Sequence, residues 1–384
     1  MTDKNAARPR YELLDGLRGV AALMVILYHV GECFATSPQT QQINHGYLAV
    51  DFFFVLSGFV IGYAYDGRWR EGMSMGNFML RRVIRLQPMV VVAVILGAVM
   101  FMIQGCEKWD GTSVSISAVM LSLLCGLFML PSLPGTLPEV RGNGEMFPLN
   151  GPSWSLFFEY IGSLFYALFL HRLSKRWLAV FTAAAGVGLA TIAIGNASGY
   201  YNIGVGWTAE GHGIWLGLVR MTFSFSVGLL ISRVFKPIKI RGAFWLCGLL
   251  IVAVLSVPYV GGETMPVANG VYDAVCTLLI FPAIVYLGAS GRTTDAKSRN
   301  VCAFLGAISY PLYIVHYPFM YLMYARAWRN GYGFDKVWPV AVCVIAGSIA
   351  LAWLLMKYYD GPVRRWLSMR LLRRSRGLEK EGQE

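Results

Sequence analysis

The first long apolar stretch, LDGLRGVAALMVILYHVGECF at residues 14–34, decides what kind of fold this chain can form. It is long enough to cross a membrane as a helix, which takes about 20 predominantly apolar residues. It also contains two basic side chains, Arg18 and His29. Ionisable groups inside a membrane span are costly unless they are paired or solvated, and they commonly mark functional sites. We therefore predict a membrane helix that carries functional residues.

The spacing of Arg18 and His29 predicts where each lies. They are eleven residues apart. At 100° per residue, eleven steps return to the same helix face within about 20°, and the rise separates the two groups by roughly 16 Å. One side chain is therefore expected at a membrane surface and the other deep below it.

The composition predicts an all-α, polytopic integral membrane helical bundle. The chain has 384 residues, of which 56% are hydrophobic and only 14% charged, and its mean hydropathy is +0.53. A soluble domain of this length is rarely so apolar. No cleavage pattern follows the first apolar run, so we expect that span to be retained.

The charge distribution indicates a lipid bilayer as the partner. The net charge of +12 could suggest nucleic acid binding. The Lys and Arg residues, however, gather in short loops between apolar runs, as the positive-inside rule expects, so we predict no nucleic acid partner. The seven cysteines show no metal-ligand spacing, and we predict no metal.

The positions of the basic loops predict about ten transmembrane helices. Two basic loops, at 68–85 and 172–176, are both expected in the cytoplasm, yet three apolar runs lie between them. An even number must cross, so we expect the short, Ser- and Gly-rich run 115–131 to be re-entrant or to lie on the outer face. The other ten runs are 17–34, 47–65, 87–104, 153–170, 178–195, 214–232, 244–259, 270–288, 302–324 and 338–357. Both termini are then cytoplasmic, which fits a plasma (inner) membrane protein.

Five motifs, in this order, resemble the membrane-bound acyltransferase 3 family, the O-acyltransferases that modify cell-surface glycans. They are LDGLRGVAALMVILYHV (14–30), GYLAVDFFFVLSGFVIGY (46–63), RRVIRLQP (81–88), GPSWSLFFEY (151–160) and ISYPLYIVHYP (308–318). The resemblance covers the membrane region and suggests a membrane-embedded domain at 1–360, followed by a basic cytoplasmic tail at 361–384. The chain has Asp360 where a Glu is common in the family, and we expect it to lack the extracellular hydrolase-like domain that some members carry.

The resemblance implies transfer of an acyl group, with acetyl favoured, from cytosolic acyl-CoA to a hydroxyl of an extracytoplasmic acceptor. The acceptor would be a surface glycan or a lipid-linked saccharide, and no metal would be required. The predicted topology places His29, Asp51, Glu159 and His316 in the outer half of four helices. His29 is the expected general base, with Asp51 or Glu159 orienting its ring. An acyl-histidine intermediate is the alternative mechanism.

The remaining predicted site residues bind the two substrates. Arg18, Arg81, Arg82 and Arg85 cluster at the inner surface, where arginine can hold the phosphates of coenzyme A by charge-assisted hydrogen bonds. His316, Ser153 and Trp154 are candidate substrate-binding residues.

Structural roles compete with each of these assignments. The arginines could be ordinary positive-inside anchors, and His29, Asp51, Glu159 and His316 could form packing or interhelical hydrogen bonds. The alternative function is a proton-coupled secondary transporter or acyl-group translocator, in which the same groups would relay protons. The motifs and the arginine cluster favour the acyltransferase.

Overall fold

The computed structural model describes residues 11–291, 293 and 295–381, with side chains up to Leu372. The ends of the two predicted regions, 1–10 and 382–384, lie outside the described residues. Within the described part the chain is helical and has no β-strand, only two isolated β-bridges. The helices are α1 (Glu12–Glu32), α2 (Ala49–Arg70), α3 (Met75–Gln104), α4 (Ile116–Leu127), α5 (Ser153–Leu168), α6 (Lys175–Ile194), α7 (Gly213–Val234), α8 (Ala243–Ser256), α9 (Val267–Val275), α10 (Phe281–Ser290), α11 (Ala296–Val315), α12 (Tyr317–Asn330), α13 (Phe334–Leu355) and α14 (Gly361–Glu381).

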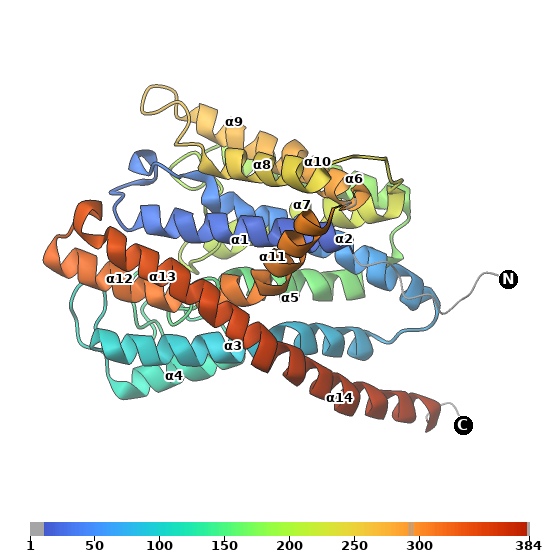
Figure 1. Cartoon of the computed structure of the whole chain (residues 1–384), viewed down its shortest axis with the longest axis horizontal. Helices are drawn as coiled ribbons and strands as arrows, with labels where there is room; N and C mark the ends of the chain where they lie inside the picture. The colour runs from blue at the N-terminus through green and yellow to red at the C-terminus, as the bar shows by residue number, and fades with distance from the viewer. Residues whose placement is uncertain (1–10, 292, 294, 382–384) are drawn as a thin grey trace.

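Most helices run along the long axis of the bundle (Figure 1). We call the end where α1 ends and α2 begins the cavity end, and the opposite end, where α1 begins and α2 ends, the terminal end. The long connections 33–48, 105–115, 128–152, 196–212 and 257–266 lie at the cavity end, at the left of Figure 1. α14 projects from the terminal end.

Length and composition confirm a helical membrane protein. Among the described residues, seven helices are long and apolar enough to cross a bilayer, or eight when the bent pair α11 and α12 counts as one span. The predicted spans 153–170 and 244–259 form the 16-residue α5 and the 14-residue α8, which are shorter than the roughly 20 residues of a usual span. The count of ten therefore stays a prediction.

Close contact between α1 and α11 depends on glycine. A Cβ atom at Gly19 would lie 2.4 Å from the backbone oxygen of Leu305, and one at Gly306 would lie 2.8 Å from Cβ of Asp15. Such distances leave room only for hydrogen, so the two backbones meet directly, as small residues allow in membrane bundles. This contact sets the register between Arg18 and His29 on α1 and the ISYPLYIVHYP segment on α11.

α11 and α12 meet at a bend of 48° next to His316. Pro318 lies in the first turn of α12. Proline has no N–H, and its ring excludes the carbonyl four residues earlier, so a continuous helix cannot pass through this point. The bend leaves His316 at the junction, where it is fully buried.

Helical structure continues across the boundary predicted between the membrane domain and the tail, and this division stays a prediction. A π-helical turn, η5 (Met356–Asp360), joins α13 directly to α14. The predicted boundary between 360 and 361 therefore falls inside one continuous helical stretch. Because a π turn inserts an extra residue, it rotates the side chains that follow it relative to those before.

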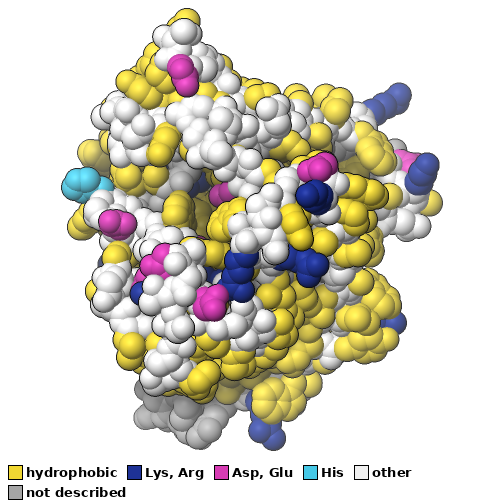
Figure 2. All heavy atoms as spheres, turned by 90° about the vertical axis from the view of Figure 1, so that its left-hand side faces the viewer, with side chains coloured by type: hydrophobic (Ala, Val, Ile, Leu, Met, Phe, Trp, Pro, Cys, Tyr) yellow, Lys and Arg dark blue, Asp and Glu magenta, His cyan; other side chains and the backbone are white. Residues whose placement is uncertain are grey.

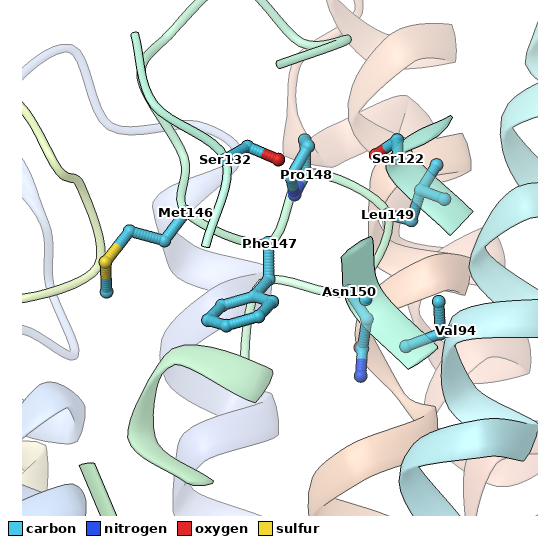
Figure 3. Close-up of a pocket in the computed structure, with 9 residues that line it drawn as sticks. Val94, Ser122, Ser132, Met146, Phe147, Pro148, Leu149 and Asn150 are labelled. Carbon is cyan, nitrogen blue, oxygen red and sulfur yellow. The ribbon is translucent and has the colours of Figure 1, made fainter. Parts of the chain in front are cut away.

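The loop before α5 packs closely against α3 and α4. A small cavity of about 10 Å³ lies among Val94 of α3, Ser122 of α4 and loop residues 146–150, and Figure 3 shows Leu149 and Asn150 beside Val94. That volume is about the size of one water molecule. The hydroxyl of Ser122 and the amide oxygen of Asn150, two residues that line this cavity, are buried without a hydrogen-bond partner among the described residues. The loop is thus part of the packed structure.

The 12-residue α4 is about 18 Å long, short of the roughly 30 Å hydrocarbon core. We expect α4 not to cross, so that the loops before and after it are on the same side. In a background without accessible native cysteines, Asp110→Cys and Thr136→Cys should both react with an impermeant maleimide added to intact cells. Glu71→Cys, at the terminal end, is the control and should react only after permeabilisation. Protection of just one of the first two would contradict this topology.

Candidate active site

A cavity of about 320 Å³ opens among the loops of the cavity end. Its wall comes from α1, α2, α5, α7, α11, α12 and the loops between them. Figure 2 looks onto this end and shows a hollow between the loops, with hydrophobic side chains in its wall and charged ones around it. A volume of this size lies in the range of small-molecule sites, roughly 300–1,000 Å³.

Tyrosine and tryptophan make up almost half of the residues in the cavity wall. The six tyrosines and four tryptophans are Tyr28, Tyr47, Tyr313, Tyr317, Tyr321, Tyr324, Trp109, Trp154, Trp207 and Trp328. Ionisable groups in the same wall are His29, Glu32, Glu145 and Arg220. Rings with hydroxyl or indole N–H groups offer both apolar faces and hydrogen-bond donors. The cavity therefore suits a ligand with apolar faces and several hydroxyls.

His29 forms a hydrogen-bonded pair with Glu32. Nδ1 of His29 lies 2.7 Å from Oε2 of Glu32, one turn later on α1. The hydroxyl of Tyr324 donates to the same carboxylate at 3.1 Å and to the backbone oxygen of His29 at 2.5 Å. The carboxylate accepts the Nδ1 proton, so the neutral ring has its lone pair on Nε2. That tautomer is the one a general base requires.

His316 lies beside His29, with the two ring centres 5.6 Å apart. Its Nδ1 donates to the backbone oxygen of Leu312 at 3.1 Å. Its Nε2 is buried and has no hydrogen-bond partner among the described residues. The two histidines, which we predicted only to share the outer half of the bundle, therefore lie next to each other in the structure.

Asp51, which we expected beside His29, is paired with Arg220. Its carboxylate accepts two hydrogen bonds from Arg220, at 2.6 and 3.3 Å, and both side chains are fully buried. Arg220 also donates to the backbone oxygens of Val205, at 2.6 Å, and Tyr47, at 3.2 Å. Burying a cation costs free energy unless acceptors satisfy its hydrogen-bond donors. The carboxylate of Asp51 supplies two of these acceptors for Arg220. Asp51 and Arg220 hold the wall of the cavity.

Glu159 is also paired elsewhere. It accepts a hydrogen bond from Arg82 and another from the hydroxyl of Ser57 at 3.0 Å. Nε of Arg82 donates to Ser163 at 3.1 Å. Glu159 therefore balances the charge of Arg82 between α3 and α5, whereas the carboxylate that contacts His29 is that of Glu32.

The four predicted inner arginines have different surroundings. Arg18 pairs with Asp15 at 2.5 Å, while Arg82 is engaged by Glu159. Arg85 lies over the ring of Tyr310, 5.6 Å from its centre, and Arg18 is one of its main charged neighbours. Arg81 lies on the same helix, half-buried. Arg18 and Arg85 thus belong to one group, and Arg82 to another.

The two candidate residues at the start of α5 have separate positions. Trp154 lines the cavity, and its ring lies 5.3 Å from the guanidinium of Arg220. Ser153 is fully buried and accepts a hydrogen bond from Asn150 at 3.0 Å. Trp154 can therefore contact a ligand, whereas Ser153 holds the preceding loop.

Sequence analysis missed three residues of this wall. Glu32 could have been found, because a carboxylate three positions after a histidine shares its helix face. Arg220 is a single arginine inside the apolar run 214–232, the same signal that singled out Arg18. Glu145 lies in a loop, where no periodicity indicates its neighbours.

In the described part of the chain, no group of three His, Cys, Asp or Glu side chains is placed to hold a metal ion.

These features define a multi-pass membrane protein with a histidine–carboxylate pair in a ligand-sized cavity, a class that includes membrane acyltransferases. The family model of the acyltransferase domain matches residues 11–357. The chain therefore belongs to the acyltransferase 3 family, and the acyl-transfer class predicted from its motifs is confirmed.

The relatives agree with this assignment. The chain is 28% identical over 399 residues to the acyltransferase MdmB of Streptomyces mycarofaciens, covering 96% of this chain and 94% of that protein. It is 36% identical over 188 residues to protein 2 of the picA locus of Rhizobium radiobacter, covering 46% of this chain and 92% of that protein. A Staphylococcus aureus (strain COL) protein with the provisional name O-acetyltransferase is 24% identical over 378 residues, covering 92% of this chain and 57% of that protein. No solved structure matches the chain.

Glu145 is an ionisable loop residue buried in the cavity wall. It accepts hydrogen bonds from the hydroxyl of Tyr321 and from Nδ2 of Asn143, the latter at 2.8 Å. Burial raises the pKa of Glu145 from 4.5 to about 7, although both hydrogen bonds favour the charged form. The folded protein therefore holds this proton more tightly than the unfolded chain does.

This pKa predicts a pH-dependent stability. The pKa of Glu145 is raised from 4.5 to about 7 in the folded protein. The contribution of its bound proton to the free energy of unfolding is therefore complete below pH 4.5 and is lost as the pH rises through about 7. The Glu145→Gln variant has no titrating group at this position. Its free energy of unfolding relative to that of the wild type should therefore rise between about pH 5 and about pH 8.5. Thermal unfolding of both purified proteins in detergent measures this trend. A difference that stays constant with pH would contradict it.

Proposed function

We propose that this protein transfers an acyl group, acetyl in the simplest case, from cytosolic acyl-CoA to a hydroxyl of an extracytoplasmic saccharide or related acceptor. The main support is the pair of His29 and Glu32 in an aromatic cavity, with Arg18 and Arg85 at the terminal end. The basic loops support a location in the plasma membrane with the terminal end in the cytoplasm.

The chemistry assigned to His29 is general-base catalysis. Nε2 takes the proton of the acceptor hydroxyl while the hydroxyl oxygen attacks the thioester carbonyl. The carbon–sulfur bond then breaks, and His29 returns the proton to the departing coenzyme A thiolate. Glu32 keeps the ring in the required tautomer and stabilises its cationic form. General-base catalysis of this kind contributes typically about 10²–10⁴-fold.

The cavity wall fits a saccharide acceptor. The apolar faces of a sugar ring can pack against rings such as Trp154 and Trp207, and its hydroxyls can bond to polar groups such as Asn143. The wall also holds two carboxylates, Glu32 and Glu145, while Arg220 is already paired with Asp51. An uncharged acceptor therefore suits the site better than an anionic one.

A row of tyrosines along α11 and at the start of α12 connects the arginines with the cavity. Tyr310 lies under Arg85, Tyr313 lines the cavity, and Tyr317 contacts the ring of His29 at 4.6 Å between centres. The seven residues from Tyr310 to Tyr317 span about 10 Å. In this proposal the extended arm of coenzyme A follows this row while its phosphates stay at the terminal end.

The first test separates chemistry from donor binding. His29→Ala should abolish transfer while coenzyme A still binds, because His29 lies at the acyl end of the donor. Transfer is measured as the release of free coenzyme A from acetyl-CoA, with a saccharide fraction from cells that express the protein as the acceptor. Binding of coenzyme A is measured by calorimetry. Full activity of His29→Ala would contradict the mechanism. A wild-type protein that binds the acceptor but leaves the thioester intact would favour a transporter.

The second test addresses Glu32. Glu32→Gln keeps the shape of the side chain but removes its charge, so it should lower the turnover rate by at least about tenfold with little change in coenzyme A affinity. Glu263→Gln, at an exposed position of the same end, is the matched control and should behave as wild type. Equal activity of the two variants would show that the carboxylate does not assist His29.

A further inference from the structure

The start of α14 supplies a residue to the inner arginine group that the sequence analysis did not include. α14 packs against α3, and the π-helical turn before it packs against α11. Arg364, in the first turn of α14, is the charged neighbour with the largest electrostatic effect on Arg85, followed by Arg18. Three cations from α1, α3 and α14 therefore lie near enough to influence one another, and one of them, Arg85, lies over the ring of Tyr310.

The protein's own carboxylates do not balance this group fully. Arg18 pairs with Asp15 at 2.5 Å and Arg364 with Asp360 at 3.0 Å. Within the described residues Arg85 makes no hydrogen bond or ion pair, and only the ring of Tyr310 lies against it. Like charges held this close repel one another, so an anion bound among them would stabilise the arrangement.

Hydrogen-bonding capacity is also left unused at this point. Nε of Arg364 is buried without a partner. Oδ1 of Asp360 is likewise buried and unpartnered, in a residue that is only 5% exposed. Buried polar atoms are nearly always hydrogen-bonded in a complete assembly, so the unpaired donor of Arg364 indicates a ligand or water that accepts its hydrogen bond.

We propose that Arg364 is a donor-binding residue, which together with Arg85 and Arg18 holds phosphate groups of coenzyme A at the terminal end. This inference rests on the proposed function, since it extends the donor site. Guanidinium groups bind phosphate oxygens through paired, charge-assisted hydrogen bonds. Asp360 competes with the phosphate for Arg364 and so limits the affinity.

Phosphate chemistry at this position could also come from a lipid headgroup. The test therefore uses the full chain in nanodiscs of two compositions, phosphatidylcholine alone and phosphatidylcholine with phosphatidylglycerol. Calorimetric titration with coenzyme A is performed in each. Binding that persists in both supports coenzyme A as the ligand. Loss of coenzyme A binding in the anionic nanodiscs would assign the site to lipid and overturn the proposal.

Variants test the role of Arg364 directly. Arg364→Ala should weaken coenzyme A binding by roughly tenfold or more, and Arg364→Lys should restore it only in part, because a point charge cannot replace the paired hydrogen bonds. Arg365→Ala is the matched control, since Arg365 is the exposed neighbour on the same turn. Equal effects of the two alanine variants would overturn the specific role of Arg364.

Asp360→Asn provides a test of opposite sign, which misfolding cannot imitate. Removing the competing carboxylate should tighten coenzyme A binding several-fold, and an unchanged or weaker affinity in this variant would overturn the proposed competition. Failure of the wild-type chain to bind coenzyme A would instead contradict the proposed function itself. If Arg85→Ala loses binding while Arg364→Ala does not, only the extension to α14 fails.

Discussion

The direct contact between the backbones of α1 and α11 is the constraint on which the site depends. It requires glycine at position 19, where a Cβ atom would lie 2.4 Å from the oxygen of Leu305. A side chain there would separate the helices and shift their register. That register brings His29 to within 5.6 Å of His316 between ring centres. It also fixes the level of Arg18 relative to the bend that Pro318 imposes on α11 and α12.

Pairing of buried charges separates the structural from the functional ionisable groups. Arg220 with Asp51, Arg82 with Glu159 and Arg233 with Asp66 each join helices that are distant in sequence. A charge in this environment is stable only when a partner satisfies it, and each of these carboxylates is used to satisfy an arginine. His29 therefore relies on Glu32, from its own helix. Arg85, which lacks such a partner in the described structure, stays available for an anionic ligand.

The two ends of the bundle offer different chemistry. The cavity end presents aromatic rings and two carboxylates around a base, which suits an uncharged, hydroxyl-bearing acceptor. The terminal end presents arginines from α1, α3 and α14, which suits phosphate. α11 spans the distance between them with a row of tyrosines. A donor and an acceptor that approach from opposite sides of a membrane would meet along this row.

Much of this protein could be predicted from its sequence. The lengths of the apolar runs determine that the chain forms membrane helices, because the thickness of the hydrocarbon core sets the same minimum length for every helix that crosses it. Spacing on a single helix determined that Arg18 and His29 share a face and lie far apart in depth, and the motifs indicated the family.

The pairing of carboxylates with cations could not be predicted in this way. Asp51 and Glu159 were expected beside His29, but their neighbours are Arg220 and Arg82. Which carboxylate meets which cation depends on how the helices are rotated and packed, and on loops such as the one that carries Glu145. Rotation and packing arise from contacts between distant segments, so only the tertiary structure decides them.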